Sequence, residues 1–338
     1  MLELRSDTFT RPTPGMLQAM FSAQVGDDVF EEDPTVKVLE EKCASLFGYE
    51  AGLFCVSGTM ANQVAINVHV RQGDEVICDQ LSHIHLYEGG GVAANSMAAL
   101  HLLQGDRGRI TAAQIREVIK ADNVHYPVSR LVSLENTVNK GGGACYDLQS
   151  LRDIKALCLQ ENLALHLDGA RIFNALIETG QSPLDYGKLF DSISVCLSKG
   201  LGAPVGSVLL GSKSFIHRAR RVRKRLGGGL RQVGYLAAAG IYALDHHREG
   251  LKEDHRRARE IAEVMKTRPE VKEVLPVDTN IVLFELQPGI SAGEYSTQLL
   301  AKGIRVLPFY ESSIRMVTHL DFTDEDLSKF KSVMTSPD

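Results

Sequence analysis

Two short, mainly apolar segments that each end in a charged residue constrain this chain more than any other feature. Residues 163–167 read Leu-Ala-Leu-His-Leu and run into Asp168, and residues 192–198 run into Lys199. Short apolar runs of this kind are typical of buried strands. In an open α/β sheet, ligands bind beyond the carboxyl ends of the parallel strands. We therefore expect Asp168 and Lys199 to converge from the ends of neighbouring strands.

Strand-like and helix-like segments alternate through the first 250 residues. Asp33-Pro34 is typical of a helix start, with the acid as N-cap and proline at the first helical position, and Gly48 is typical of its end. The alternation predicts an α/β fold with a mostly parallel sheet and helices on both faces. The expected strands are 53–56, 75–78, 131–134, 163–168, 192–197 and 206–211, and the expected helices include 34–47, 111–121, 148–160, 213–226 and 231–248.

The pattern changes after residue 248. A polar helix at 252–267 is followed by strand-like segments at 280–285, 304–307 and 314–317, with a helix at 291–302 between them. We predict a large domain of residues 1–248, which includes an extended N-terminal arm, and a small C-terminal α+β domain of residues 249–338.

Composition excludes several classes of protein. The 338 residues are 44% hydrophobic and 23% charged, which is typical of a globular protein, and the net charge of −5 gives no overall attraction to nucleic acid. The longest Ala/Leu-rich stretch, 235–244, is too short to span a membrane, and no signal peptide is visible. Six scattered cysteines without metal-ligand spacing indicate reduced thiols and a cytoplasmic location, and we expect no bound metal.

A buried acid and a lysine at adjacent strand ends suit pyridoxal 5'-phosphate chemistry. The lysine forms a Schiff base with the cofactor aldehyde, and the acid pairs with the pyridinium nitrogen. Each residue also has a simpler interpretation. Asp168 could cap a helix or pair with Arg171, and Lys199 could be a surface lysine at a strand end. The pairing of the two residues favours one cofactor site.

Three further positions suit the same site. Gly58 and Thr59 lie between a strand and a helix, where free N–H groups and the helix dipole attract a phosphate, although a plain turn has the same appearance. His83 follows strand 75–78, so its ring could lie over the cofactor, although a lone histidine is more often structural. His125 precedes strand 131–134, and its position alone leaves its role open. Histidine is the natural base for a hydroxyl proton near neutral pH.

Two basic features have more than one interpretation. Residues 218–225 contain six arginines and lysines, which form either a solvated helix face or a contact to a phosphate in a neighbouring subunit. The acidic balance of the whole chain disfavours a nucleic-acid surface there. Arg315, in a late strand, could bind a substrate carboxylate through two hydrogen bonds.

Taken together, these motifs resemble the low-specificity L-threonine aldolases, a family of pyridoxal phosphate enzymes with the aspartate aminotransferase fold (fold type I). The matching segments keep their order from residue 5 to residue 321 and are jointly far more specific than any one motif. They are residues 5–8, 26–34, 57–63, His83 with residues 87–90, 135–137, 166–172, 198–206, 227–232 and 315–321.

The resemblance implies a role for each cofactor residue. Lys199 would carry the cofactor, Asp168 would contact the pyridine nitrogen and His83 would stack on the ring. Gly58 and Thr59 would hold the phosphate. Lys224 and Arg231 would reach the phosphate of a partner subunit, because similar proteins are homotetramers built from dimers whose active sites lie at the dimer interface.

The resemblance also implies a substrate side to the site. Ser6, Arg171 and Arg315 would bind the carboxylate of a small amino-acid substrate, with Arg171 also beside the cofactor. His83 and His125 would be the candidates for the β-hydroxyl proton, and Tyr87 would line the pocket near the substrate side chain.

Two departures from the family pattern affect substrate preference. Val138 stands where the family often has histidine, and His85 stands where an aromatic residue is common, so that His85 faces the expected substrate pocket with different chemistry. The implied reaction is cleavage of L-threonine or L-allo-threonine to glycine and an aldehyde. The alternatives are a β-eliminating lyase or an amino-acid racemase with the same cofactor, and a binding protein without catalysis.

Overall fold

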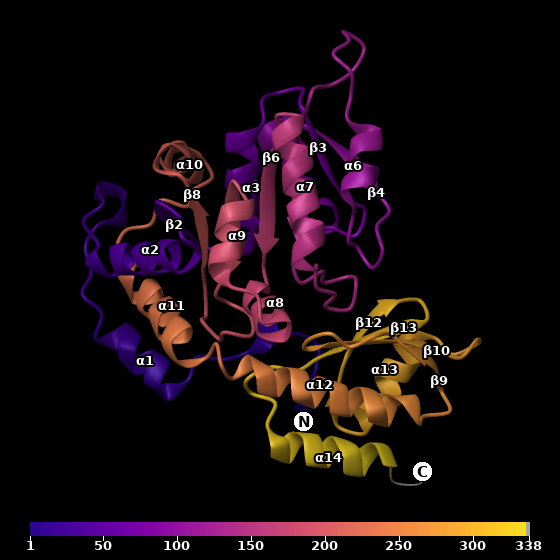
Figure 1. The fold of residues 1–338 in the computed structure, drawn as a ribbon. Coiled ribbons are helices and arrows are strands. Elements are labelled where there is room, and N and C mark those ends of the chain that lie inside the picture. Colours follow the sequence, from indigo (N-terminus) through magenta and orange to yellow (C-terminus); the bar gives the residue numbers. More distant parts are fainter. Residues whose placement is uncertain (336–338) are drawn as a thin grey trace.

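The computed structural model describes residues 1–335 and is built around a seven-stranded sheet (Figure 1). Only β8 runs against its neighbours, because it pairs antiparallel with both β2 and β7 while the remaining pairs are parallel. The expected mostly parallel sheet is confirmed. The strands, in spatial order, are β2 (Ala51–Cys55), β8 (Ser207–Gly211), β7 (Ser192–Cys196), β6 (Ala164–Gly169), β5 (Ser129–Glu135), β3 (Glu75–Asp79) and β4 (Ala99–Leu103).

Helices cover both faces of this sheet. On one face, α3 (Gly58–His69) packs on β6, β7 and β8, and α10 (Lys213–Arg225) packs beside it. On the other face, α2 (Pro34–Phe47) and α7 (Leu148–Gln160) pack on the sheet (Figure 1). The strands are apolar on both faces for this reason: Leu53 and its neighbour Phe54 are both buried but belong to different core clusters. The other α-helices of this part are α1 (Pro14–Phe21), α4 (His83–Leu86), α5 (Gly91–Ser96), α6 (Ala112–Val118), α8 (Ile172–Thr179), α9 (Pro183–Leu189) and α11 (Gly234–His246).

The C-terminal part has a core of its own. A four-stranded antiparallel sheet, in the order β12 (Leu307–Tyr310), β13 (Ser313–Val317), β10 (Ile281–Leu286) and β9 (Val271–Val274), packs with α12 (Leu251–Lys266), α13 (Ala292–Ala301) and α14 (Asp324–Thr335). The predicted boundary near residue 248 falls between α11 and α12. Leu2 and Leu4 also belong to this second core, and β1 (Leu2–Glu3) pairs in parallel with β11 (Ile304–Arg305). The start of the chain therefore joins the two parts.

Local signals place the helix ends where the sequence indicates. The Asp33 carboxylate accepts from the backbone N–H groups of Thr35 and Val36 at 3.1 Å, and Gly48 ends α2 with φ of 74°. Asp33 also accepts from the N–H groups of Gly26 and Gly234, so the same cap ties α2 to α11 and to the N-terminal segment.

The extended N-terminal arm is a wrong prediction for residues 14–21. These residues form α1 (Pro14–Phe21), which starts at the Thr13 side chain and packs on α11. The edge strand β4 was not anticipated either. Its sequence, Ala-Leu-His-Leu-Leu, is mainly apolar, but its residues are exposed or half-buried at one edge of the sheet.

The structure bears on two expectations from composition, which concern the cysteines and membrane-spanning helices. All six cysteines are free thiols, and five are buried. Burial raises the pKa of Cys43 to about 12. Across residues 1–335, no helix is long and apolar enough to cross a membrane.

Candidate active site

Asp168 and Lys199 lie at the ends of two hydrogen-bonded neighbours, as predicted. Asp168 is on β6, where it pairs with Ser194 of β7, and Lys199 is in the loop that follows β7. The Asp168 side chain is buried and accepts from Asn62 Nδ2 at 2.7 Å and from the Ala170 N–H at 2.9 Å. Hydrogen bonds of this kind stabilise an ionised carboxylate. Lys199 is half-buried, at the edge where a parallel sheet binds its ligands.

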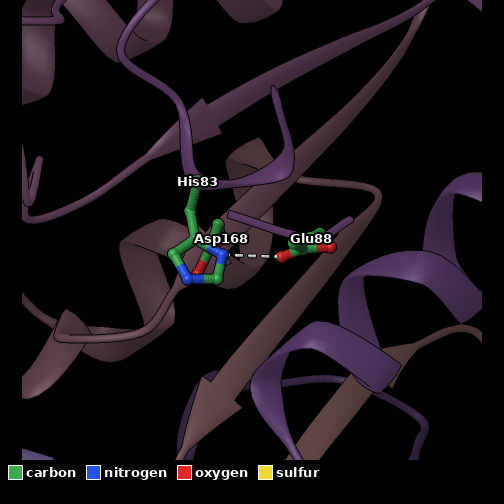
Figure 2. A group of neighbouring side chains, drawn as sticks. All are labelled: His83, Glu88 and Asp168. Carbon is green, nitrogen blue, oxygen red and sulfur yellow. Dashed lines mark hydrogen bonds and ion pairs between the residues drawn. The ribbon is translucent and has the colours of Figure 1, made fainter. Parts of the chain in front are cut away.

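His83 lies beside Asp168 and is held by a second buried acid (Figure 2). Its Nδ1 is 2.8 Å from Oε1 of Glu88, and ligand atoms of His83, Glu88 and Asp168 lie within 4.8 Å of one another. Burial alone would lower the pKa of His83, but the hydrogen bond to Glu88 and the charge of Asp168 raise it above its ordinary value. With Nδ1–H donating to Glu88, Nε2 is the nitrogen that remains to accept a proton.

Glu135 supports His83 and was not among the predicted site residues. It is buried at the end of β5 and accepts from the N–H of His83 at 2.9 Å and of Asn139 at 2.8 Å. Burial and the charge of Asp168 raise the pKa of Glu135 to about 7. A signal for it was present: Glu135 ends the apolar run 131–134, just as Asp168 ends its own run.

The start of α3 suits an anion, as predicted. Ser57 caps the helix by accepting from the N–H of Met60 at 3.1 Å. Among residues 1–335, no protein acceptor is found for the N–H groups of Gly58 and Thr59. A Cβ placed on Gly58 would meet no atom within 4 Å, so the space above this turn is open. The first turn of α3 thus offers free donors to a phosphate.

Arg171 is neutralised inside the protein. Its Nε and one terminal nitrogen each donate to Asp7 at 2.7 Å, and both side chains are buried. Although burial alone would raise the pKa of Asp7, the adjacent Arg171 holds it well below its usual range. The other terminal nitrogen of Arg171 lies 3.3 Å from Oδ1 of Asn139.

Arg315 shares the Asn139 oxygen but has no carboxylate of its own. It lies on β13, is 7% exposed, and donates to Asn139 Oδ1 at 2.8 Å and to the Arg5 carbonyl at 3.2 Å. Its Nε has no partner within residues 1–335, and no ion pair is formed. Burial and the charge of Arg171 lower the pKa of Arg315 to about 10, so the group is still charged at neutral pH. A buried guanidinium without a carboxylate beside it suits the binding of an anionic group.

The remaining predicted pocket residues differ in their surroundings. Ser6 is half-buried next to Asp7, and its hydroxyl accepts from Thr8 Oγ1 at 2.9 Å. Tyr87 is half-exposed, with its ring centroid 5.6 Å from that of His83. Lys140 Nζ lies 5.7 Å from the centre of the Tyr87 ring. His85 is half-buried in α4, one residue beyond Ile84.

Three predicted site residues do not join this group within one chain. His125 is exposed on the segment between α6 and β5. This segment lies at the amino-terminal ends of the parallel strands, whereas Asp168 lies near their carboxyl ends (Figure 1). Lys224 is exposed on α10 and lines a separate hollow of about 580 Å³. Arg231 is exposed and pairs with Asp27 at 2.9 Å. Any role for these three residues at an active site requires a second subunit, and their assignment stays a prediction.

Comparison with known proteins agrees with this geometry over the whole chain. The sequence model of the beta-eliminating lyases matches residues 3–288. The low specificity L-threonine aldolase of Escherichia coli O157:H7 is 42% identical over 97% of both chains. The chain belongs to the beta-eliminating lyase family. A probable low-specificity L-threonine aldolase of Arabidopsis thaliana is 40% identical over 99% of this chain and 98% of its own. The resemblance seen in the sequence is therefore confirmed.

Solved structures confirm the fold. The threonine aldolase of Leishmania major superposes with a TM-score of 0.86 over 99% of this chain and 98% of its own, at 20% identity. A putative L-allo-threonine aldolase of Listeria monocytogenes gives a TM-score of 0.82 over 98% of this chain and 95% of its own, at 22% identity. The fold is that of the fold type I enzymes, and this family and fold are in general pyridoxal phosphate-dependent.

Proposed function

We propose that this protein is a pyridoxal 5'-phosphate-dependent aldolase that cleaves L-threonine, L-allo-threonine and related β-hydroxy-α-amino acids to glycine and an aldehyde. The observation that carries the proposal is the placement of Asp168 and Lys199 at the ends of adjacent strands, with His83 beside Asp168. The names of the full-length relatives support the choice of substrate class.

The residues present fit the cofactor. Lys199 would attach it, Asp168 would contact its pyridine nitrogen, His83 would stack on its ring, and Gly58 and Thr59 would donate to its phosphate. The open space above Gly58 and the buried, hydrogen-bonded carboxylate of Asp168 are the features that this group requires. When bound, the cofactor would act as an electron sink for the pair that remains on the substrate Cα after the Cα–Cβ bond breaks.

The two arginines bind the substrate carboxylate in this proposal. Arg171 is already neutralised by Asp7, so Arg315 supplies the uncompensated positive charge. Asn139 holds both guanidinium groups, and Ser6 adds a hydroxyl next to Asp7. Fixing the carboxylate orients the substrate, and orientation of the bond to be broken contributes to the rate.

His83 Nε2 is the group that we assign to the β-hydroxyl proton. Its Nδ1 is engaged by Glu88, and its backbone is held by Glu135, so the ring has a fixed orientation. Tyr87 and His85 would line the part of the pocket that receives the substrate side chain. His125 could take part only in the site of another subunit.

We also propose that the protein works as a homodimer or a homotetramer in the cytoplasm. Lys224 and Arg231 are exposed cations outside the site of their own chain, as a residue that reaches a partner's phosphate has to be. The small C-terminal domain, residues 249–338, would contribute Arg315 to each site.

Trapping of the cofactor tests this proposal. Borohydride reduction of the yellow protein, followed by peptide mass analysis, should locate the cofactor on Lys199. Lys199→Ala should lose both the adduct and aldehyde release. Lys213→Ala is the matched control, because Lys213 is an exposed lysine just beyond the end of β8, and it should keep both. An adduct that persists in Lys199→Ala would overturn the assignment.

A further inference from the structure

A continuous series of hydrogen bonds, buried except at its half-buried far end at His69, leads from Asp168 along the sheet, away from the site. Asn62 Nδ2 donates to Asp168 Oδ2 at 2.7 Å, and Asn62 Oδ1 is 3.2 Å from His166 Nε2. His166 Nδ1 is 2.8 Å from Ser192 Oγ, which is 2.8 Å from His69 Nε2. The series spans the face of the sheet that α3 covers.

The periodicity of three elements brings these residues together. Residues two apart in a strand share a face, so His166 and Asp168 of β6 point to the same side, as do Ser192 and Ser194 of β7. These strands are in register, with His166 opposite Ser192 and Asp168 opposite Ser194. Helix α3 crosses them and contributes Asn62 and, at its C-terminal end, His69.

The orientation of Asn62 fixes the direction of every hydrogen bond. Its amide nitrogen faces two carboxylates, Asp168 and Glu88 at 2.9 Å, which accept and cannot donate when ionised. Its oxygen faces the hydroxyl of Ser194 at 2.7 Å. A flipped amide would set its oxygen against both carboxylates, so the observed orientation is the only one that satisfies all neighbours.

The two histidines then have defined protonation states. His166 has to carry its proton on Nε2, which donates to Asn62, so its Nδ1 accepts from Ser192. The Ser192 hydroxyl, having donated, accepts from His69 Nε2–H. Burial lowers the pKa of His166 to about 4 and that of His69 to about 3, so both rings are neutral at pH 7, as this arrangement requires.

We infer that Asn62, His166, Ser192 and His69 are positioning residues that hold Asp168 as an oriented carboxylate, because every hydrogen bond that links them in series donates toward it. This inference rests on the proposed function of Asp168 as the contact to the pyridine nitrogen. Aligned hydrogen bonds in a buried site polarise one another, which strengthens the last bond to the carboxylate. None of the four is a catalytic residue.

Substitutions at His166 test the inference in the whole protein. His166→Leu removes the donor to Asn62 and should weaken pyridoxal phosphate binding and slow aldehyde release by roughly 10-fold each, by analogy with the lower end of the range for residues that orient metal ligands. His166→Gln can place an N–H near the same point and should restore both to within about 3-fold. His255→Leu is the matched control, since His255 is a histidine of equal burial that contacts Asn174 and Glu178 instead. It should change neither quantity.

A second readout does not depend on the cofactor. In protein stripped of cofactor, ¹⁵N NMR of the histidine side chains should show His166 and His69 as neutral Nε2–H forms between pH 6 and 8. Ser192→Ala should alter the signals of both rings, whereas the conservative Ser192→Thr should preserve them.

The outcomes separate this inference from the proposed function. Equal cofactor affinity and aldehyde release in wild type and His166→Leu would overturn the positioning role, as would Nδ1–H forms of either ring. If His255→Leu lost as much cofactor affinity and aldehyde release as His166→Leu, the effect of His166→Leu would be one of packing alone. That result would also overturn the positioning role. Wild-type protein that binds no pyridoxal phosphate, yet shows the predicted NMR signals, would instead refute the proposed function.

Discussion

The two halves of the site differ in how complete they are before any ligand binds. On the side of the large sheet, Asp168 accepts from Asn62 and Ala170, and Arg171 is neutralised by Asp7. On the side of the small sheet, Arg315 is buried with an unpartnered Nε and no carboxylate. The first half is satisfied by the protein itself, whereas the second half is satisfied only when an anion arrives.

Because of this difference, we expect Arg171 to contribute mainly to the stability of the fold and Arg315 mainly to the binding of the substrate carboxylate. A buried ion pair that loses one partner leaves an uncompensated charge, so Arg171 and Asp7 are needed for the fold. A buried arginine without a carboxylate partner costs free energy in the empty protein and recovers it on binding a carboxylate. Two arginines that touch the same Asn139 oxygen should therefore respond in opposite ways to the same substitution.

The largest effect is expected for Arg171→Leu. This change leaves the Asp7 carboxylate buried without its partner, and we expect a loss of about 3–5 kcal/mol in the free energy of unfolding. Urea denaturation of the purified variant, compared with wild type, measures it. A variant as stable as wild type would show that Asp7 and Arg171 are not coupled as the structure indicates.

The Arg315→Leu variant should lose activity without losing stability, in contrast to Arg171→Leu. We expect kcat/KM for aldehyde release to fall by roughly 100-fold, because a charge-assisted pair to the substrate carboxylate is lost. The free energy of unfolding of the cofactor-free protein should stay the same or rise, because an uncompensated buried charge is removed. Destabilisation comparable to that of Arg171→Leu would contradict the comparison.

A smaller effect is expected for Glu88→Gln, on the pH dependence. His83 must be neutral to accept a proton, so activity should be present above its pKa and lost as pH falls through it. Burial lowers this pKa, but the hydrogen bond to Glu88 and the charge of Asp168 raise it overall. Removing the Glu88 charge should therefore move the acid limb of kcat/KM to lower pH, by about one unit. An unchanged acid limb would remove His83 from this role.

The sequence predicted the centre of the site better than its support. Asp168 and Lys199 end apolar runs, and the strand register brings such ends together, so local pattern was sufficient. Glu135 also ends an apolar run, but its partners are the backbone N–H groups of His83 and Asn139, and no sequence pattern specifies such contacts. Asp7 pairs with Arg171 across 164 residues of sequence, and only the tertiary structure shows that contact.

The secondary-structure elements also differ in how well the sequence predicts them. Strands such as β7, buried along their whole length, were predicted, whereas the equally apolar but partly exposed edge strand β4 was not. Helix α1 begins with the same local signal as α2, a capping residue followed by proline (Thr13-Pro14), which the prediction of an extended arm did not use; packing on α11 stabilises the helix further. The place of His125 relative to an active site depends on assembly, which one chain does not specify.

The most direct test of the central claim is product analysis with purified protein and either L-threonine or L-allo-threonine. The account predicts a yellow protein that releases acetaldehyde and glycine in equal amounts, at rates whose ratio gives the preference at Cβ. Yellow protein that releases a 2-oxo acid and ammonia instead would show elimination, and a change of configuration at Cα alone would show racemisation. Either result would contradict the assignment of the site to aldol cleavage.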